Sequence, residues 1–391
     1  MIGVIKLRFF KYCDKLLIFI TLILVSIGTI MIFSASNVSA YMRFLASPYN
    51  YLIRQIIILI VCLFFYVAIC FLNVKFSSRI SSFVCYLLLV PLFLLFVFGK
   101  VTNNAQSWFK FGRFLFQPSE FFKVAMIIWL ACYYSKNVKS LDKYTKALYP
   151  VLIFGLAFAT IVLQPDLGTA LILLMIFAFM FVISPISKDI KKKIYTLGFG
   201  MIFLVGLLLL SVGNKILTPT QMSRITSVVS ESGPCSEENY YTDGNQVCNG
   251  YIAINNGGLT GLGLGNSIQK YLYLPEAHTD FIFCIIIEEL GLLMGIGIIV
   301  LYMILIARII HVGNKALTDR DAMICYGGAF YIFIHIMINL MGVFGLIPMT
   351  GVPLPFMSYG GSYLISLSIM MAIIERISYE NNLKRALNKG K

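Results

Sequence analysis

Apolar runs long enough to cross a hydrocarbon core of roughly 30 Å recur along the whole chain, separated by short polar loops. With 59% hydrophobic and only 12% charged residues, a chain of 391 residues is a membrane domain and not a string of soluble domains. We therefore predict an all-α polytopic membrane protein that forms a single domain over residues 1–391. Its ten expected spans lie near residues 15–35, 51–73, 80–99, 117–135, 148–163, 167–184, 194–213, 279–307, 322–347 and 358–378.

The distribution of basic residues indicates which side of the membrane each loop faces. An even number of spans puts both termini on one side, and the segments on that side hold most of the 31 Lys and Arg residues. The loops at 136–147 and 185–193 are especially rich in Lys. The positive-inside rule then places both termini in the cytoplasm. The net charge of +14 indicates topology and attraction to anionic lipid, and we expect no nucleic-acid partner.

One extracytoplasmic loop, at about 214–278, is too long to be a mere connector. It contains Cys235 and Cys248, which can form a local disulfide in an oxidising compartment or remain free thiols. No Cys or His spacing in the chain resembles a zinc site.

The motif QPSEFFK at 117–123 opens the fourth span, with Pro where a first helical turn tolerates it. Glu120 and Lys123 form either an ordinary helix pair or part of a polar cavity, since charges at the membrane boundary are costly unless paired or functional. Trp108, Lys110 and Arg113 lie just upstream, and their amphipathic, cationic character suits a phosphate-bearing lipid.

Two further motifs are turns between outward ends of spans. QPDLGT at 164–169 is on its own a tight turn, with Asp166 favourably placed at a helix N-terminus. The Pro- and Gly-rich stretch 348–362 has irregular backbone at membrane depth, which must be buried in protein or line a wet cavity. We favour the cavity.

The fourth motif, LPEAHTDFIF at 274–283, leads from the long loop into the eighth span. Asp280 either caps that helix or acts as a general base, because a carboxylate at a partly desolvated edge has a raised proton affinity. The upstream glycines at 257–265 follow no strand, so we discount a dinucleotide site and expect no nucleotide or organic cofactor.

Together the four motifs, in their order along the chain, resemble the SEDS family of shape, elongation, division and sporulation proteins of the RodA and FtsW type, over essentially the whole chain. The longest shared stretch is GLGNSIQKYLYLPEAHTDFIF at 263–283. The resemblance implies ten transmembrane helices in the bacterial cytoplasmic membrane and a glycosyltransferase that polymerises lipid II at the outer face. It also implies a class B penicillin-binding protein as partner.

Carried over residue by residue, the resemblance implies that Asp280 is catalytic and that Glu120, Lys123 and Asp166 are functional. The expected substrate-binding residues are Trp108, Lys110, Arg113, Arg224, Lys270, His278, Thr279 and Ser358. The family often has an arginine-rich stretch where this chain has QSWFK at 106–110, and the segment with the two loop cysteines also departs from its pattern.

The expected reaction is attack of a lipid II sugar hydroxyl on the anomeric carbon of the growing chain, with Asp280 as base and undecaprenyl pyrophosphate leaving with inversion. Lys123, Arg113 and Arg224 supply positive charge to the leaving group. A divalent cation, Mg²⁺ or Mn²⁺, is a candidate cofactor, with Glu120 and Asp166 as candidate ligands.

Two other functions fit part of the pattern. A lipid II flippase would use the same carboxylates, together with Glu288 and Glu289, as a substrate path or proton relay. A non-catalytic scaffold of the cell-wall synthesis complex would explain the long loop but not Asp280. The clustering of polar residues on one side of the membrane favours the enzyme.

Overall fold

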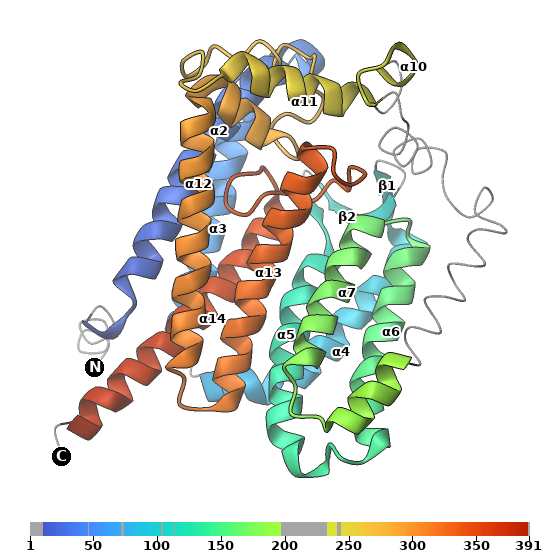
Figure 1. The fold of residues 1–391 in the computed structure, drawn as a ribbon, viewed down its shortest axis with the longest axis vertical. Helices are drawn as coiled ribbons and strands as arrows, with labels where there is room; N and C mark the ends of the chain where they lie inside the picture. The colour runs from blue at the N-terminus through green and yellow to red at the C-terminus, as the bar shows by residue number, and fades with distance from the viewer. Residues whose placement is uncertain are drawn as a thin grey trace.

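The computed structural model describes residues 11–45, 47–71, 74–102, 105–112, 114–196, 233–240 and 244–389. Long helices run side by side through this part of the chain and form a bundle (Figure 1). They are α2 (Lys15–Phe44), α3 (Asn50–Phe71), α4 (Val74–Phe98), α5 (Pro118–Asn137), α6 (Tyr144–Leu163), α7 (Leu167–Val182), α12 (Ile282–Asn314), α13 (Asp319–Val343) and α14 (Gly361–Lys389).

Seven helices in the described ranges are long and apolar enough to cross a membrane. The apolar α7 is shorter, and α5 carries Glu120 and Lys123 near its start and Lys136 near its end. Each apolar run predicted from the sequence falls on one of the long helices, except the run at 194–213, of which residues 197–213 lie outside the described residues. A helical, multi-pass membrane protein is therefore confirmed, and the total of ten spans stays a prediction.

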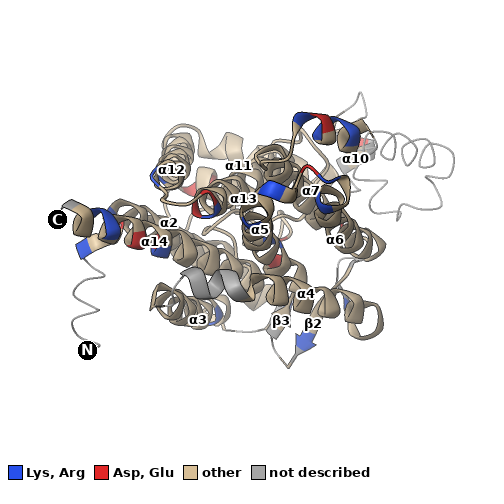
Figure 2. Ribbon diagram, turned by 90° about the horizontal axis from the view of Figure 1, so that it is seen from below, with Lys and Arg blue, Asp and Glu red and all other residues tan. Residues whose placement is uncertain are grey.

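From α2 to α7, and again from α12 to α14, successive helices alternate in direction. The helix α2 begins, and α14 ends, at one end of the bundle, while the short helix α11 (Gly244–Gly257) lies across the other end (Figure 1). Figure 2 looks onto the first end and shows Lys and Arg positions gathered on the helix ends and connections there. The α5–α6 connection, with its short helix η1 (Val138–Ser140), belongs to this end. All four sequence motifs lie toward the opposite end.

The all-α prediction is wrong for residues 100–116. Three short antiparallel strands form a sheet there, in the order β1 (Lys100–Thr102), β2 (Ala105–Phe111) and β3 (Phe114–Phe116). Gly112, with φ of 59°, turns the chain between the last two strands. The sheet is tied to the α6–α7 turn because the Gln106 N–H donates to the carbonyl of Gln164 at 3.2 Å.

The helix α12 is broken at Gly291, where φ is 84° and ψ is 165°. A Cβ at this position would lie 2.3 Å from the carbonyl oxygen of Leu259, so only glycine fits. The break leaves carbonyls at the end of the first half-helix. The Leu262 and Gly263 N–H groups bond two of them, those of Glu288 and Glu289, at 2.9 Å each.

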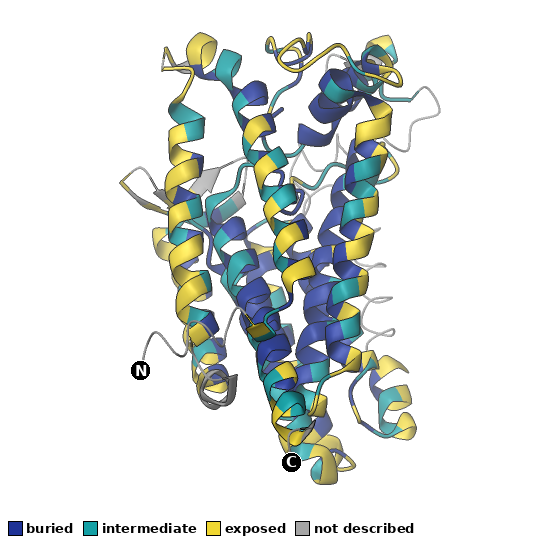
Figure 3. Ribbon diagram, turned by 90° about the vertical axis from the view of Figure 1, so that its left-hand side faces the viewer, coloured by how far each residue is buried: buried dark blue, intermediate teal, exposed yellow. Residues whose placement is uncertain are grey.

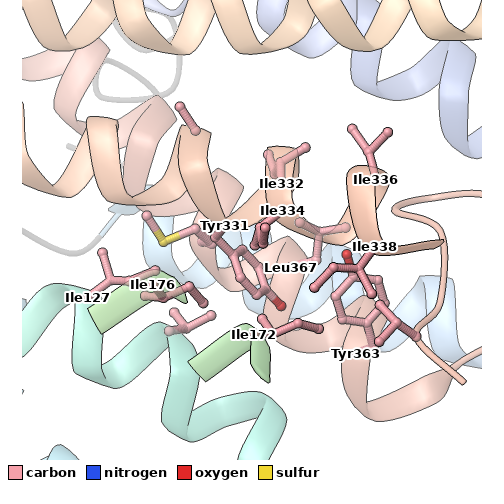
Figure 4. Close-up of a cluster of buried hydrophobic side chains, with 14 of the residues drawn as sticks. Ile127, Ile172, Ile176, Tyr331, Ile332, Ile334, Ile336, Ile338, Tyr363 and Leu367 are labelled. Atoms are coloured by element: carbon pink, nitrogen blue, oxygen red, sulfur yellow. The ribbon is translucent and has the colours of Figure 1, made fainter. Parts of the chain in front are cut away.

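The centre of the bundle is occupied by α13. In its most apolar stretch 78% of the residues are buried, against 17% in α3, which is therefore peripheral. Figure 3 shows buried positions on the inward faces of the helices and exposed ones outside. Figure 4 shows one buried cluster in which four helices meet, through Ile127 of α5, Ile172 of α7, Tyr331 of α13 and Leu367 of α14.

Candidate functional site

A cavity of about 1520 Å³ opens at the motif-bearing end of the bundle. All four sequence motifs contribute to its wall, through Glu120, Asp166, Asp280 and the segment 347–353. Its lining also includes apolar side chains of the spanning helices, such as those of Ile57, Val61, Phe158, Leu171 and Leu174. One chamber thus has a polar part and an apolar part.

Asp280 is held in the wall by its main chain. The Asn339 side-chain amide donates to the carbonyl of Asp280 at 2.9 Å and to that of Val352 at 2.8 Å. Asn339 therefore joins the Asp280 segment to the Pro- and Gly-rich stretch.

Two further hydrogen bonds make the same connection. The Ser358 hydroxyl donates to the carbonyl of Thr279 at 2.6 Å, and the Tyr359 N–H donates to the carbonyl of His278 at 3.0 Å. Thr279 lines the cavity, whereas Ser358 is buried and acts from behind it. The two motifs, about eighty residues apart in the chain, form one structural unit.

The carboxylate of Asp280 faces a wall that lacks a side chain. Gly351, with φ of +70°, is placed so that a Cβ would lie 3.4 Å from Asp280 Oδ2. Asp280 is partly exposed and belongs to the cavity lining. The glycine leaves room for a ligand atom beside the carboxylate.

Glu120 and Lys123 form a buried ion pair, with Lys123 Nζ 2.9 Å from Glu120 Oε1. The exposed fraction is 3% for Glu120 and 0% for Lys123. His335 of α13 completes the group, with its Nε2 3.2 Å from Lys123 Nζ. Because an ammonium only donates, this imidazole nitrogen accepts and the ring is neutral. Glu120 and His335 line the cavity, whereas Lys123 lies behind them. The ammonium of Lys123 is therefore not part of the wall, although the sequence had allowed that position.

Asp166 caps a helix, as its sequence position suggested, and it also lines the cavity. Its Oδ1 accepts the Thr169 N–H at 3.1 Å and caps α7, while its Oδ2 accepts the Gln117 amide at 3.1 Å. The capped turn lies in the cavity wall. Asp166 thereby connects the first two motifs.

The predicted substrate-binding residues divide into three groups. Trp108, His278 and Thr279 line the cavity. Three others are not among the lining residues, namely Lys110, which is exposed on β2, Lys270 and Ser358. Arg113 and Arg224 lie outside the described residues.

Lys270 is not among the residues that line the cavity, and its contact with substrate stays a prediction. Its Nζ is 3.0 Å from Glu289 Oε1 in a buried ion pair, and the Ser34 hydroxyl is 2.7 Å from the same carboxylate. The physical reason is that Lys270 neutralises a carboxylate that would otherwise be buried alone.

Glu288 is occupied by the same loop. It accepts the Asn256 amide at 3.1 Å, the main-chain N–H groups of residues 268 and 269, and the Ser267 hydroxyl. Both Glu288 and Glu289 are fully buried. Their carboxylates accept hydrogen bonds from the turn at 266–270 and hold it in place. This arrangement gives no support to a proton relay through Glu288 and Glu289.

Arg54 and Tyr51 of α3 are functional candidates that the sequence analysis missed. Among the described residues that line the cavity, Arg54 is the one Lys or Arg, whereas the lining carboxylates are those of Glu120, Asp166, Glu276 and Asp280. The sequence does contain a signal for Arg54. It is a basic residue near the outward end of an apolar run, where the positive-inside rule predicts few basic residues.

Aromatic rings gather beside Arg54. The Tyr51 ring lies 4.5 Å from that of His278 and 5.2 Å from that of Tyr359, between centroids. Burial lowers the pKa of His278, although the nearby carboxylate of Glu276 opposes the shift. Burial raises the pKa of Tyr359, and the charge of Arg54 opposes that shift. Both groups are therefore neutral at pH 7.

Within the described ranges, no group of three or more His, Cys, Asp or Glu side chains is arranged to hold a metal ion. The buried Oε2 atom of Glu120 makes no hydrogen bond, however. A cation at this point would need ligands from a bound substrate in addition to protein carboxylates.

Cys235 and Cys248 form a disulfide. It joins the segment around α10 (Glu237–Tyr240) to the buried side of α11. The helix in turn packs against the Asp280 segment, since a Cβ on Gly250 would lie 3.2 Å from the Phe281 ring.

Residues 14–383 match the family model for FtsW, RodA and SpoVE, described as cell cycle proteins. The chain is 36% identical over 385 residues to the probable peptidoglycan glycosyltransferase FtsW of Bacillus subtilis, covering 97% of this chain and 94% of that protein. It is 36% identical over 369 residues to the stage V sporulation protein E of the same organism, covering 93% and 96%.

Solved structures share the fold. One, reported for the structural coordination of polymerisation and crosslinking by a peptidoglycan synthase complex, superposes with a TM-score of 0.72 at 24% identity, covering 94% of this chain and 98% of the other. The rod shape determining protein RodA of Thermus thermophilus gives 0.65 at 23% identity, covering 94% and 97%.

Proposed function

Because this chain belongs to the FtsW, RodA and SpoVE family of cell cycle proteins, we propose that it is a peptidoglycan glycosyltransferase that polymerises lipid II. The observation that carries the proposal is the meeting of all four sequence motifs in the wall of one cavity, with Asp280 among the lining residues. The two-part lining suits a substrate that has a polar sugar pyrophosphate and a long apolar chain.

Asp280 is the general base in this proposal. It takes the proton from the 4-hydroxyl of the incoming lipid II sugar as that oxygen attacks the anomeric carbon of the growing glycan. The bond from that carbon to the pyrophosphate oxygen breaks, undecaprenyl pyrophosphate leaves, and the configuration inverts. The room left by Gly351 beside Oδ2 supports this role.

Arg54 is the side chain best placed to bind the pyrophosphate, because it supplies the cavity lining's positive charge within the described residues. Lys123 acts indirectly. It holds Glu120 at the wall through their 2.9 Å contact.

A divalent cation, Mg²⁺ or Mn²⁺, is part of the proposal. Glu120 and Asp166 would hold it, and the unpaired Oε2 of Glu120 supports the fit. Mg²⁺ is commonly bound by one or two carboxylates together with substrate phosphates. When bound, it would neutralise negative charge on the leaving pyrophosphate.

The proposed active site faces the outside of the cell, because the Lys-rich connections lie at the opposite end of the bundle. Labelling of an Ile190→Cys variant tests this orientation. An impermeant thiol reagent should leave position 190 unlabelled in intact cells, and strong labelling there would reverse it. The fold shared with the synthase complex supports a crosslinking partner, for which we propose a class B penicillin-binding protein.

The deciding experiment incubates the purified full-length protein with lipid II, with and without Mg²⁺ or Mn²⁺, and separates the products on a gel. We expect glycan polymer from the wild-type protein and none from an Asp280→Ala variant of equal thermal stability. Lipid II transport without polymer would instead identify a flippase, and neither activity would favour a scaffold.

A further inference from the structure

Two polar contacts between α2 and α12 mark the limits of an apolar zone. Near one end, Arg308 Nε lies 2.8 Å from Asp14 Oδ2, and near the other the Ser34 hydroxyl lies 2.7 Å from Glu289. Residues 16–33 and 290–307, between these contacts, contain no charged residue.

The spacing of these contacts matches a bilayer. Twenty residues of continuous helix separate Asp14 from Ser34 along α2, which corresponds to about 30 Å at the α-helical rise. The hydrocarbon core of a typical bilayer is about as thick. The Ser34–Glu289 contact therefore marks the boundary of the hydrocarbon core on the cavity side.

The glycine-rich segment 258–264 lies at this boundary. The Leu262 N–H donates to the carbonyl of Glu288, and the Leu292 N–H donates to the carbonyl of Gly258, both at 2.9 Å. The segment is thus fixed by its main chain to the break in α12, next to the carboxylate that contacts Ser34.

The three leucine side chains of this segment are exposed. Leu259 is 64% exposed, Leu264 57% and Leu262 39%, and no residue from 258 to 264 is charged. They continue the exposed apolar surface of α12, where the neighbouring Leu293 is 63% exposed. Removing a leucine side chain from water is worth about 2 kcal/mol, so three of them form a substantial anchor.

We infer that residues 258–264, the leucine segment, insert into the leaflet on the cavity side of the membrane. The partner is the lipid itself, at the depth where headgroups meet acyl chains. The segment would then hold the break in α12, and with it the half-helix that follows Asp280, at the height of the membrane surface. This inference does not depend on the proposed enzymatic activity.

Variants that each add one tryptophan to the two native ones, Trp108 and Trp129, test it in the full-length protein. The protein is placed in phosphatidylcholine vesicles whose lipids carry bromine either near the carbonyl or near the middle of the acyl chain. The probe is Leu264→Trp. Leu293→Trp, on the membrane face of α12, is the buried-in-lipid control. Leu45→Trp is the water control, because Leu45 is 89% exposed and follows the last residue of α2, eleven residues beyond Ser34.

The fluorescence that each variant adds to the wild-type signal is compared between bromolipids. We expect the Leu264→Trp signal to be quenched strongly by the shallow bromine and less by the deep one, and the Leu45→Trp signal by neither. Quenching of Leu264→Trp no greater than that of Leu45→Trp would overturn the inference. Protection of Leu264→Trp from an aqueous quencher only when another protein is added would also overturn it, in favour of a protein-docking surface.

Discussion

Asn339 donates its side-chain amide to the main-chain carbonyl of Asp280 at 2.9 Å. The contact does not involve the carboxylate, so a change of the Asp280 side chain leaves it in place. The position of residue 280 and the chemistry of residue 280 can therefore be tested separately.

The first prediction concerns that chemistry. Asp280→Asn should leave the melting temperature nearly unchanged but reduce polymerisation by roughly a hundredfold or more, because a neutral amide does not accept the hydroxyl proton. Polymer yield and thermal melting are measured on one detergent preparation. Near-normal polymer from this variant would remove Asp280 from the mechanism.

The second prediction concerns the buried pair of Glu120 and Lys123. Lys123→Met leaves the Glu120 charge buried and unpaired, and breaking a buried pair costs about 3–5 kcal/mol of stability. The double variant Glu120→Gln, Lys123→Met should regain most of that stability but not the polymerase activity. Return of activity together with stability would show that the pair is purely structural.

The third prediction concerns Arg54. Because Arg54 is exposed, Arg54→Gln should change the free energy of unfolding by less than about 0.5 kcal/mol. It should raise the KM for lipid II, and added salt should affect the variant less than the wild type. Lys110→Gln, which removes an exposed cation that does not line the cavity, is the matched control. Equal effects of the two changes would count against a specific pyrophosphate contact.

The fourth prediction concerns pH. Burial lowers the pKa of His278 in the folded protein below its ordinary value, so between the two pKa values the unfolded state binds more protons than the folded state. Stability should therefore fall as the pH drops through about 6.5. His278→Gln should flatten this part of the stability curve, and an unchanged slope would show that other groups cause it.

The fifth prediction concerns the disulfide of Cys235 and Cys248. Closing a loop of this length stabilises a fold by about 3 kcal/mol, so the Cys235→Ser, Cys248→Ser variant should melt at a lower temperature. Reductant should lower the melting temperature of the wild type but not of the variant. Equal sensitivity of both proteins to reductant would place the effect elsewhere.

The spans were predictable because hydropathy is a local property of the sequence. The break in α12 was not, since Gly291 sits in an apolar run whose mean hydropathy carries no information about a φ of 84°. The three-stranded sheet at 100–116 was missed for a related reason. Its pairing depends on contacts of the segment with itself and with Gln164, which no span pattern shows.

For the site, the motifs identified Asp280, Glu120 and Asp166, which do line one cavity. Arg54 lies near the outward end of α3 and His335 lies inside α13, and the packing of these helices brings both to the cavity wall. Lys270 is the opposite case, because it was predicted to bind substrate but is not among the lining residues. It lies within a motif, but its partner Glu289 and neighbour Ser34 come from α12 and α2 and draw it away from the chamber.

The broken helix α12 also limits how this protein can be recombined with its relatives. The N–H groups of Leu262 and Gly263 bond the carbonyls at the break. Only glycine fits at position 261, because a Cβ there would lie 2.3 Å from the Glu289 carbonyl oxygen. A chimera whose junction falls between residues 263 and 291 would join two halves of this interlock from different parents. Junctions before residue 257 and after residue 293 move it as one inherited block, and such grafts should fold where the inner junctions fail.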